Sequence, residues 1–365
     1  MTRKLLFITF ANKQAYTGGG QGAQRNLKSL RIVLGEANVT PYIIQPQEGP
    51  RSLGQKLRRL TGVLKGYLGA LNDESLNDIM RLLDSGGYTD LFIDSSQLGL
   101  VARIVRRRFP RLHIYTFFQN IEYDFMRSCV LEGRDYLHAF WIPMARHNER
   151  CACKYSDKFA VFNQRDATRL NELYGCAASA VIPISMTDNY HDDAPLVDID
   201  YSQPREALFV GSYFFGNTAG LRWFCDQVLP QANMHLTIVG SGMQAFAHDI
   251  PSTERISIYS DVPDLAPYFE QADFMVLPIT TGGGMKVKTA EGLKYGKYII
   301  GTREALQGYE VDDTIATVCQ TKDDFLRAIN NFHQPYKFNA PSRELFKRKY
   351  SFEATIEQFK HLLQP

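Results

Sequence analysis

The sequence FMVLPITTGGGMKVKTAEGLKYGKYII occupies residues 274–300, and its pattern decides the fold. Phe274–Leu277 is a short apolar run typical of a buried strand. A loop with three glycines, Gly282–Gly284, follows it, and a helical pattern begins near Val287 before a second strand-like run at Tyr298–Ile300. Strand, loop, helix and strand in this order form the repeating unit of a parallel α/β sheet.

The same loop carries a candidate anion site. Glycines let backbone N–H groups approach an anion closely, and a helix N-terminus attracts negative charge. Lys286 and Lys288 flank the helix start and can neutralise a diphosphate, while Glu291 can accept hydrogen bonds from sugar hydroxyls. A flexible turn with solvated lysines is the alternative, and the strand–loop–helix context favours the anion site.

Strand-like runs alternate with helical patterns along the rest of the chain. Further strands are expected at Leu5–Phe10, Pro41–Gln45, Asp90–Ile93, His113–Phe118, Lys158–Phe162, Ala180–Ile182, Ala207–Val210, His235–Val239 and Ile256–Tyr259. Helices are expected at Gln24–Leu34, Val101–Arg108, Asp166–Leu173 and Ala219–Val228. We therefore predict an α/β protein of two doubly wound, Rossmann-like domains facing a central cleft, with ligands beyond the carboxyl ends of the strands.

The domain boundaries follow from a polar, acidic, proline-containing segment in the middle of the chain. A length of 365 residues fits two domains of roughly 150 residues each. We expect an N-terminal domain over residues 1–185, a linker over 186–205, a C-terminal domain over 206–349, and a helix over 350–365 that crosses back to the N-terminal domain. Ser351 is expected to cap this helix, and one face is expected to hold Phe352, Ile356, Phe359 and Leu363.

The formal net charge is +2, but the charged residues are distributed unevenly along the chain. Residues 1–150 hold 21 Lys and Arg against 13 Asp and Glu, a net +8, and residues 151–365 hold 20 against 26, a net −6. This asymmetry predicts an anionic partner for the first half. A hydrophobic content of 44% excludes wholesale disorder.

The expected compartment is the cytoplasm. The six cysteines form no Cys-x-x-Cys pair, which favours free thiols in a reducing environment and argues against a zinc site. The brief apolar run after Met1 is interpreted as a first strand rather than a signal peptide. No apolar stretch reaches the ~20 residues of a membrane span.

At several places the chain resembles a known family. The run Gly282–Lys297 resembles the donor-binding signature of retaining glycosyltransferases of family 4, which have the two-domain GT-B fold. Two other C-terminal stretches agree with the family in order and spacing, namely Leu208–Ser212 with Asn217 and Leu221–Phe224, and Asp264–Asp273. Less specific matches lie at Gly18–Asn26, Phe117–Tyr123, Lys154–Lys158, Asn163–Asp166 and Tyr350–Phe352. The resemblance spans most of the chain.

The resemblance implies a nucleotide-sugar donor, with UDP as one candidate nucleotide, on the C-terminal domain and an acceptor on the N-terminal domain. It assigns Glu291 to the ribose, Lys286 and Lys288 to the diphosphate, and the backbone around Val262 to the base. Other donor-binding residues are expected at Gly19, Gly20, Ser212, Asn217, Gly282, Gly283, Gly284 and Met285.

Three places depart from the family pattern. Gly283 stands where many relatives have a second glutamate, eight residues before Glu291. Many relatives have an arginine after the first strand of the C-terminal domain and a lysine further on, and in this chain these places hold Ser212 and, nearby, Asn217. Gln119 replaces a frequent histidine; it can hydrogen-bond a donor-sugar hydroxyl but cannot become charged.

The resemblance also implies a mechanism, a front-face transfer with retention in which the leaving phosphate oxygen accepts the acceptor's proton. Gln119, Lys286 and Lys288 are then the expected catalytic residues, acting by positioning and electrostatics. No metal and no other cofactor is expected. Asp94 and Glu122 are candidate acceptor contacts. Capping of the following helix by Asp94 or by one of the next two serines is, however, the favoured role in that stretch, and capping is also the favoured role for Asp166.

Two basic stretches suggest an anionic acceptor. In the first, Leu53, Leu57, Leu60, Leu64, Leu68 and Leu71 recur at helical spacing among Arg51, Lys56, Arg58, Arg59 and Lys65. Such a helix can lie on an anionic bilayer or pack on the sheet with its basic face in water. The second comprises Arg103, Arg106, Arg107, Arg108 and Arg111. A polyprenyl-diphosphate-linked acceptor at the inner face of the plasma membrane accounts for both, whereas no aromatic-rich motif supports nucleic acid.

Three functions stay open at this point. The first is a glycosyltransferase building a bacterial surface polysaccharide, such as a capsule. The second is a non-catalytic GT-B relative that binds a partner or a glycan. The third, a dinucleotide-dependent oxidoreductase, rests on a G-x-G-x-x-A match at Gly18–Ala23. That match is weak because seven residues separate it from the strand, and the next strand ends at Gln45 rather than an acid.

Overall fold

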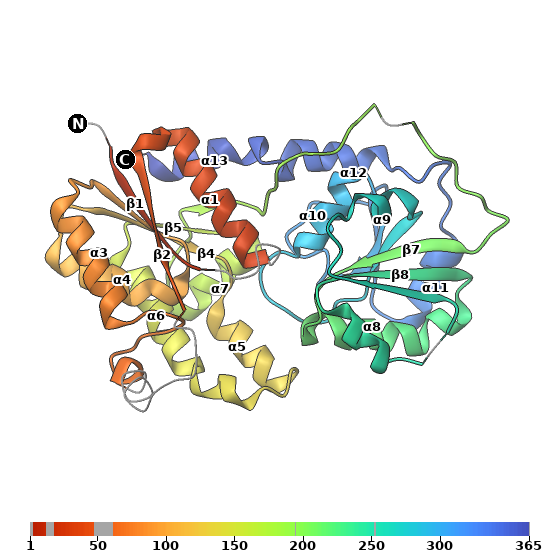
Figure 1. Ribbon diagram of the computed structural model, residues 1–365, viewed down its shortest axis with the longest axis horizontal. Helices are drawn as coiled ribbons and strands as arrows, with labels where there is room; N and C mark the ends of the chain where they lie inside the picture. Colours follow the sequence, from red (N-terminus) through yellow and green to blue (C-terminus); the bar gives the residue numbers. More distant parts are fainter. Residues whose placement is uncertain (1–2, 12–17, 47–60, 194, 252, 365) are drawn as a thin grey trace. The chain divides into compact units, whose positions relative to one another are not determined.

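The computed structural model describes residues 3–11, 18–46, 61–193, 195–251 and 253–364 (Figure 1). The chain divides into two compact units. Unit 1 comprises Met1–Ile184 and Thr355–Pro365, and unit 2 comprises Ser185–Ala354. The segment 186–205, expected to be a linker, therefore lies in unit 2.

Unit 1 is built on a six-stranded parallel sheet in the order β2-β1-β3-β4-β5-β6. Its strands are β1 (Leu5–Phe10), β2 (Val39–Ile44), β3 (Asp90–Ile93), β4 (His113–Phe118), β5 (Lys158–Val161) and β6 (Ala180–Val181). Its helices are α1 (Gly18–Leu34), α3 (Asp73–Ser85), α4 (Gly99–Arg108), α5 (Glu122–Leu131), α6 (Ile142–Tyr155), α7 (Gln164–Tyr174) and α13 (Ile356–Leu363).

Unit 2 has a second six-stranded parallel sheet, in the order β12-β11-β10-β7-β8-β9. Its strands are β7 (Arg205–Val210), β8 (Met234–Gly240), β9 (Ile256–Ser260), β10 (Phe274–Leu277), β11 (Ile299–Thr302) and β12 (Ala316–Cys319). Its helices are α8 (Phe215–Gln227), α9 (Ala266–Gln271), α10 (Val287–Lys294), α11 (Lys322–Asn330) and α12 (Ala340–Leu345).

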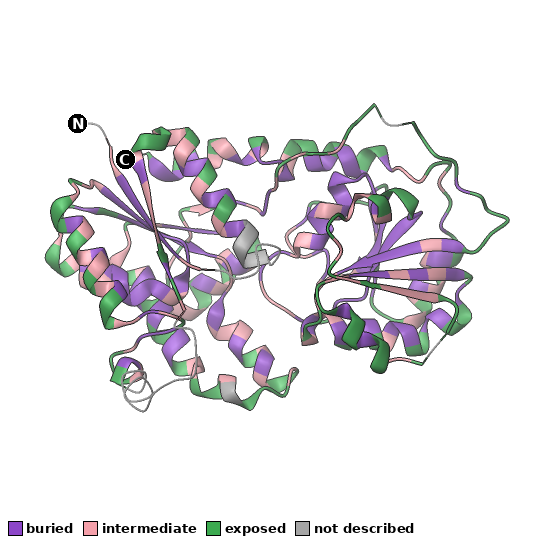
Figure 2. Cartoon of the chain, viewed as in Figure 1, coloured by how far each residue is buried: buried purple, intermediate pink, exposed green. Residues whose placement is uncertain are grey.

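The predicted α/β class is confirmed, and the apolar strands explain it. In β3 and β10 every residue is buried (Figure 2), as expected when helices cover both faces of a parallel sheet. In unit 2, α8 and α11 lie on one face of the sheet and α10 and α12 on the other (Figure 1).

The end of the chain packs on unit 1. The Arg25 guanidinium of α1 is buried and lies 5.3 Å from the Phe117 ring centroid and 5.2 Å from that of Phe359 in α13. The helix expected over residues 350–365 is longer than the observed one, since α13 begins only at Ile356. Ser351 instead accepts from the amide of Ala354, in the turn before the helix.

The basic leucine stretch does not form one helix. Arg51, Leu53, Lys56, Leu57, Arg58, Arg59 and Leu60 lie outside the described residues. Residues 61–64 are helical, but the helix ends at Leu64, which is exposed, and Gly66 then adopts φ +87°. Leu68 and Leu71 are buried beyond that turn, so the expectation of a single helical face through Leu71 is wrong.

Candidate active site

The order of strands in unit 2 reverses between β7 and β10. From β7 the chain proceeds to β8 and β9 on one side, and from β10 to β11 and β12 on the other. Helices α8 and α10 leave these two central strands toward opposite faces of the sheet (Figure 1). Ligands of open α/β sheets bind beyond the carboxyl ends of the strands at such a reversal.

Lys288, in the first turn of α10, lies at this reversal. Its ammonium donates to Oδ1 of Asn217 at 2.5 Å, and the Asn217 amide nitrogen donates to the main-chain oxygen of Ser212 at 2.8 Å. The ammonium is 5.0 Å from the Phe209 ring centroid. A Cβ atom on Gly211 would lie 2.9 Å from it, so the missing side chain gives the ammonium its room. Three of the residues singled out from the sequence are thus brought together.

The pKa of Lys288 is lowered from 10.5 to about 7. Burial is the largest cause, the neighbouring Lys286 cation acts in the same direction, and Glu291 opposes both effects. Lys288 is only 9% exposed, and its ammonium donates to a neutral amide. A buried cation at a helix N-terminus whose hydrogen-bond partner is a neutral amide is suited to receive an anion.

Lys286 has a different environment. Its ammonium forms an ion pair with Glu304 at 2.7 Å and donates to the main-chain oxygen of Gly283 at 3.2 Å. The buried Tyr309 hydroxyl donates to the Lys286 main-chain oxygen at 2.6 Å. Lys286 therefore fixes the loop before α10, and sequence reasoning missed both Glu304 and Tyr309.

The loop itself depends on glycine. Gly282 adopts φ +138° and Gly284 φ +57°, conformations that other L-residues rarely adopt. Met285 is buried next to the loop. The backbone that leads into α10 thus requires glycine at positions 282 and 284.

Glu291 lies one turn after Lys288 on α10 and is half-buried. Burial raises its pKa, while the cations Lys294 and Lys288 lower it. The base-side candidate Val262 follows Asp261, which adopts φ +55°. The Asp261 carboxylate accepts from the Ser241 hydroxyl at 2.8 Å, so the loops after β8 and β9 are joined.

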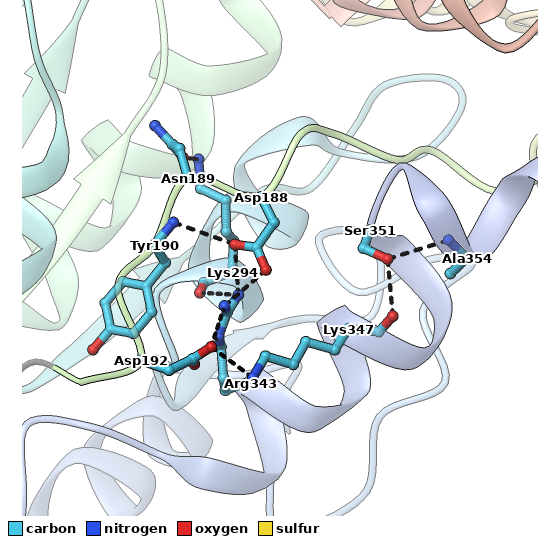
Figure 3. Close-up of polar contacts among 9 residues, drawn as sticks. All are labelled: Asp188, Asn189, Tyr190, Asp192, Lys294, Arg343, Lys347, Ser351 and Ala354. Carbon is cyan, nitrogen blue, oxygen red and sulfur yellow. Dashed lines mark hydrogen bonds and ion pairs between the residues drawn. The ribbon is translucent and has the colours of Figure 1, made fainter. Parts of the chain in front are cut away.

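A buried arginine anchors the far end of α10. Arg343 of α12 pairs with Asp188 at 2.7 Å and with Asp192 at 2.8 Å, and it donates to the main-chain oxygen of Lys294 (Figure 3). The Lys294 ammonium donates to Asn189 at 2.8 Å. The segment once expected to be a linker is therefore bound to the helix that carries Lys288.

In unit 1, Asp94 and Gln119 follow the adjacent strands β3 and β4. Asp94 is fully buried, and its carboxylate accepts from the Thr9 hydroxyl at 3.0 Å and from the Asn26 amide at 2.5 Å. Burial raises the pKa of Asp94 to about 7, although these hydrogen bonds and the Arg25 charge oppose the rise. Ser95, not Asp94, caps the following turn, because it accepts from the amide of Gln97.

Glu122 begins α5 and is buried, which raises its pKa to about 7. Beneath it, Glu149 accepts from the Glu122 amide at 2.6 Å and from the Tyr174 hydroxyl at 2.6 Å. Burial raises the pKa of Glu149 to about 8. Sequence reasoning missed this second carboxyl.

Other expectations need correction. Asn163, not Asp166, caps α7, since it accepts from the Asp166 amide at 2.9 Å. Gly19 and Gly20 lie in the first turn of α1, which begins at Gly18 rather than Gln24. In the second basic cluster, Arg106 pairs with Asp157 and Arg108 with Asp84.

Within the described ranges, no three His, Cys, Asp or Glu side chains gather as metal ligands would. The same part of the chain has no helix both long and apolar enough to cross a membrane.

Comparisons with known proteins agree with the geometry. Residues 204–334 match the family model of group 1 glycosyl transferases. No curated protein matches the sequence. Among solved structures, the apo form of the lipopolysaccharide outer core galactosyltransferase WaaB is similar with a TM-score of 0.68 and 12% identity, covering 99% of both chains.

Two further structures have the same fold. Alr3699/HepE of Anabaena, in complex with UDP and glucose, has a TM-score of 0.65 and 13% identity over 98% of both chains. A glycosyltransferase from Rickettsia africae has a TM-score of 0.63 and 12% identity over 100% of both chains. Residues 204–334 thus match the family model of group 1 glycosyl transferases, and the whole chain has the fold of these solved glycosyltransferase structures.

Proposed function

We propose that the chain transfers a sugar from a UDP-sugar to a surface glycan or its lipid-linked precursor, and that unit 2 binds the nucleotide at the start of α10. The observation that carries this proposal is the buried Lys288 ammonium at the β7–β10 reversal, paired with the neutral Asn217. Solved structures of the same fold named as complexes with UDP and with UDP-glucose support the choice of nucleotide.

Each part of the donor has its own proposed contacts in unit 2. Lys288 and the N-terminus of α10 stabilise the diphosphate as it leaves. Glu291 accepts hydrogen bonds from the ribose hydroxyls, and the backbone at Val262 binds the base. Gly282–Gly284 and Met285 line the loop that Lys286 holds through Glu304. Lys286 is therefore a positioning residue, and Lys288 is the cation assigned to the phosphates.

The transfer needs no protein nucleophile. The bond from the sugar to the diphosphate oxygen breaks while the acceptor oxygen bonds to the same face of the sugar, and the released phosphate oxygen takes the acceptor's proton. Gln119 hydrogen-bonds the transferred sugar. Preorganised charge at the leaving group and positioning of the acceptor supply the rate enhancement.

The nucleotide can be identified by thermal unfolding with UDP, GDP and dTDP, because a ligand that binds the folded state raises the apparent stability. We expect UDP to raise the melting temperature most, and UDP-glucose or UDP-galactose to be hydrolysed slowly in the absence of acceptor. Binding of UDP without hydrolysis or transfer of any UDP-sugar would favour a non-catalytic, glycan-binding role.

The net charge of +8 on residues 1–150 supports an anionic acceptor, such as a polyprenyl-diphosphate-linked glycan at the inner face of the membrane. Glu122 and Asp94 are its proposed neighbours in unit 1. The double variant Arg58→Glu, Arg59→Glu should release the protein from vesicles of anionic phospholipid. Unchanged binding of this variant would refute the membrane part of the proposal.

A further inference from the structure

Two of the six cysteines differ from the others in their surroundings. Cys153 and Cys176 are half-buried, and both pack against the apolar cluster of unit 1 that contains Phe159 and Leu170. The remaining four are buried, namely Cys129, Cys151, Cys225 and Cys319. Reagents in solution therefore reach this one pair of thiols more readily than the rest.

A polar contact between α6 and the end of α7 brings these two thiols together. Glu149 lies one turn before Cys153 on α6, and its carboxylate accepts from the Tyr174 hydroxyl at 2.6 Å. Gly175 then ends α7 with φ +69°, and Cys176 follows directly. Residues four apart on a helix share a face, so Cys153 faces the segment that carries Cys176. The two thiols in fact lie within hydrogen-bonding reach of each other.

We propose that Cys153 and Cys176 form a reversible oxidation site, which a low-molecular-weight disulfide such as glutathione disulfide converts to an intramolecular disulfide bond. The proposal is independent of the sugar transfer. Free thiols are the state expected in a reducing compartment, and a disulfide forms there when the pool of small thiols becomes oxidised. The bond joins α6 to the residues after α7, beside the contact of Glu149 with Tyr174.

The oxidation takes place in two exchange steps. The Cys176 thiolate attacks one sulfur of glutathione disulfide, the bond between the two glutathione sulfurs breaks, and one glutathione leaves as a thiolate that takes up a proton. Cys153 then releases its proton to water and attacks the Cys176 sulfur, which frees the second glutathione. In total, two cysteine thiols lose two electrons, and one glutathione disulfide is reduced to two glutathione thiols.

Cys153 is assigned the second of these steps. Burial raises its pKa, and the neighbouring Cys176 thiol and the Glu149 charge act in the same direction. Because the thiolate is the attacking form, Cys153 reacts poorly with a disulfide from solution. It reacts with the Cys176 sulfur instead, since the two are held next to each other. A glutathione adduct on Cys176 is therefore the expected intermediate.

The test incubates the reduced full chain with glutathione disulfide and locates the modified cysteines by proteolysis and mass spectrometry. We expect the Cys153 peptide to be linked to the Cys176 peptide in most molecules, and dithiothreitol should restore both thiols. Because the bond constrains the unfolded chain, it should also raise the melting temperature by roughly 4–10 °C.

Single variants separate the two steps. Cys153→Ala should stop at a glutathione adduct on Cys176, and Cys176→Ala should leave Cys153 reduced. Cys151→Ala is the matched control, because Cys151 is a buried cysteine of the same helix, and it should oxidise like wild type. Glutathione adducts alone in wild-type protein, a disulfide between other cysteines, or no loss of thiols would overturn the proposal. Should Cys153→Ala not fold, Cys176→Ala, which changes a loop residue, decides.

Discussion

The Lys288 ammonium donates to Asn217 at 2.5 Å, and Asn217 in turn donates to the main-chain oxygen of Ser212 at 2.8 Å. A buried cation is thus held by a neutral amide, at a helix N-terminus where positive potential already accumulates. This arrangement costs folding free energy in the empty protein, and an anionic ligand offsets that cost. The predictions about Lys288 follow from this relationship.

Replacing the buried cation should stabilise the empty protein. Lys288→Met keeps the aliphatic stem, and it should raise the free energy of unfolding by about 1–3 kcal/mol, because an apolar side chain of similar size avoids the desolvation of the ammonium. Denaturant unfolding of the full chain measures this. A less stable Lys288→Met protein would show that Asn217 fully compensates the charge.

The same comparison has a definite pH dependence. The pKa of Lys288 is about 7 in the folded chain and near its ordinary 10.5 when unfolded. The unfolded state therefore binds more protons between these values, and wild-type stability relative to Lys288→Met should rise with pH across this window. A difference that stays flat from pH 7 to 9 would contradict the low pKa.

Nucleotide binding should take up a proton. The free Lys288 is largely neutral above pH 7, and a bound diphosphate favours its charged form. Between pH 7.5 and 9, where a terminal phosphate of pKa ≈ 6 is already ionised, UDP affinity should fall as pH rises, by up to tenfold per unit. Calorimetry in two buffers of different ionisation enthalpy detects the proton, and pH-independent affinity would argue against this role.

The ion pair of Lys286 can be tested against an exposed one. Glu304→Gln leaves the Lys286 charge without its partner, and because both side chains are mostly buried we expect a loss of about 1–3 kcal/mol. Glu310→Gln is the control, since its pair with Lys349 is solvent-exposed and should contribute under 1 kcal/mol. Equal losses would show that the Glu304 pair does not fix the loop.

The arginine at the end of α10 should be a strong stabilising contact. Arg343 is 3% exposed and binds Asp188, Asp192 and the Lys294 main-chain oxygen. Arg343→Ala should cost roughly 3–5 kcal/mol, since it removes a buried charged donor from both aspartates and from the carbonyl, although Lys347 still pairs with Asp192. Arg327→Ala, which breaks an exposed pair with Asp324, should cost under 1 kcal/mol. Thermal unfolding of both variants decides the comparison.

Local patterns in the sequence predict the strands and the glycine loop well. β1, β3, β4 and β10 have the expected bounds, because each is an apolar run between turn residues. Strand β12 was missed: Ala316–Cys319 is four residues long, and only two of them are buried. Helix α5 was missed because its apolar residues follow no clear helical stripe.

The partners of site residues could not be predicted in the same way. Lys288 and Asn217 are 71 residues apart, and Asp94 and Gln119 follow adjacent strands whose pairing no local pattern specifies. The sequence identified these residue types as candidates. It could not show that the Lys286 ammonium pairs with a carboxylate while the Lys288 ammonium donates to an amide, because this depends on where Glu304 and Asn217 lie in the folded chain.

The central claim is that Lys288 binds the diphosphate of the donor. The most direct measurement is calorimetric titration of UDP into wild-type protein, Lys288→Met, and the control Lys322→Met at the start of α11, at pH 6.5. We predict that Lys288→Met weakens UDP binding at least tenfold although the protein remains folded and is more stable, and that Lys322→Met binds like wild type. Unchanged UDP affinity in Lys288→Met would contradict the account.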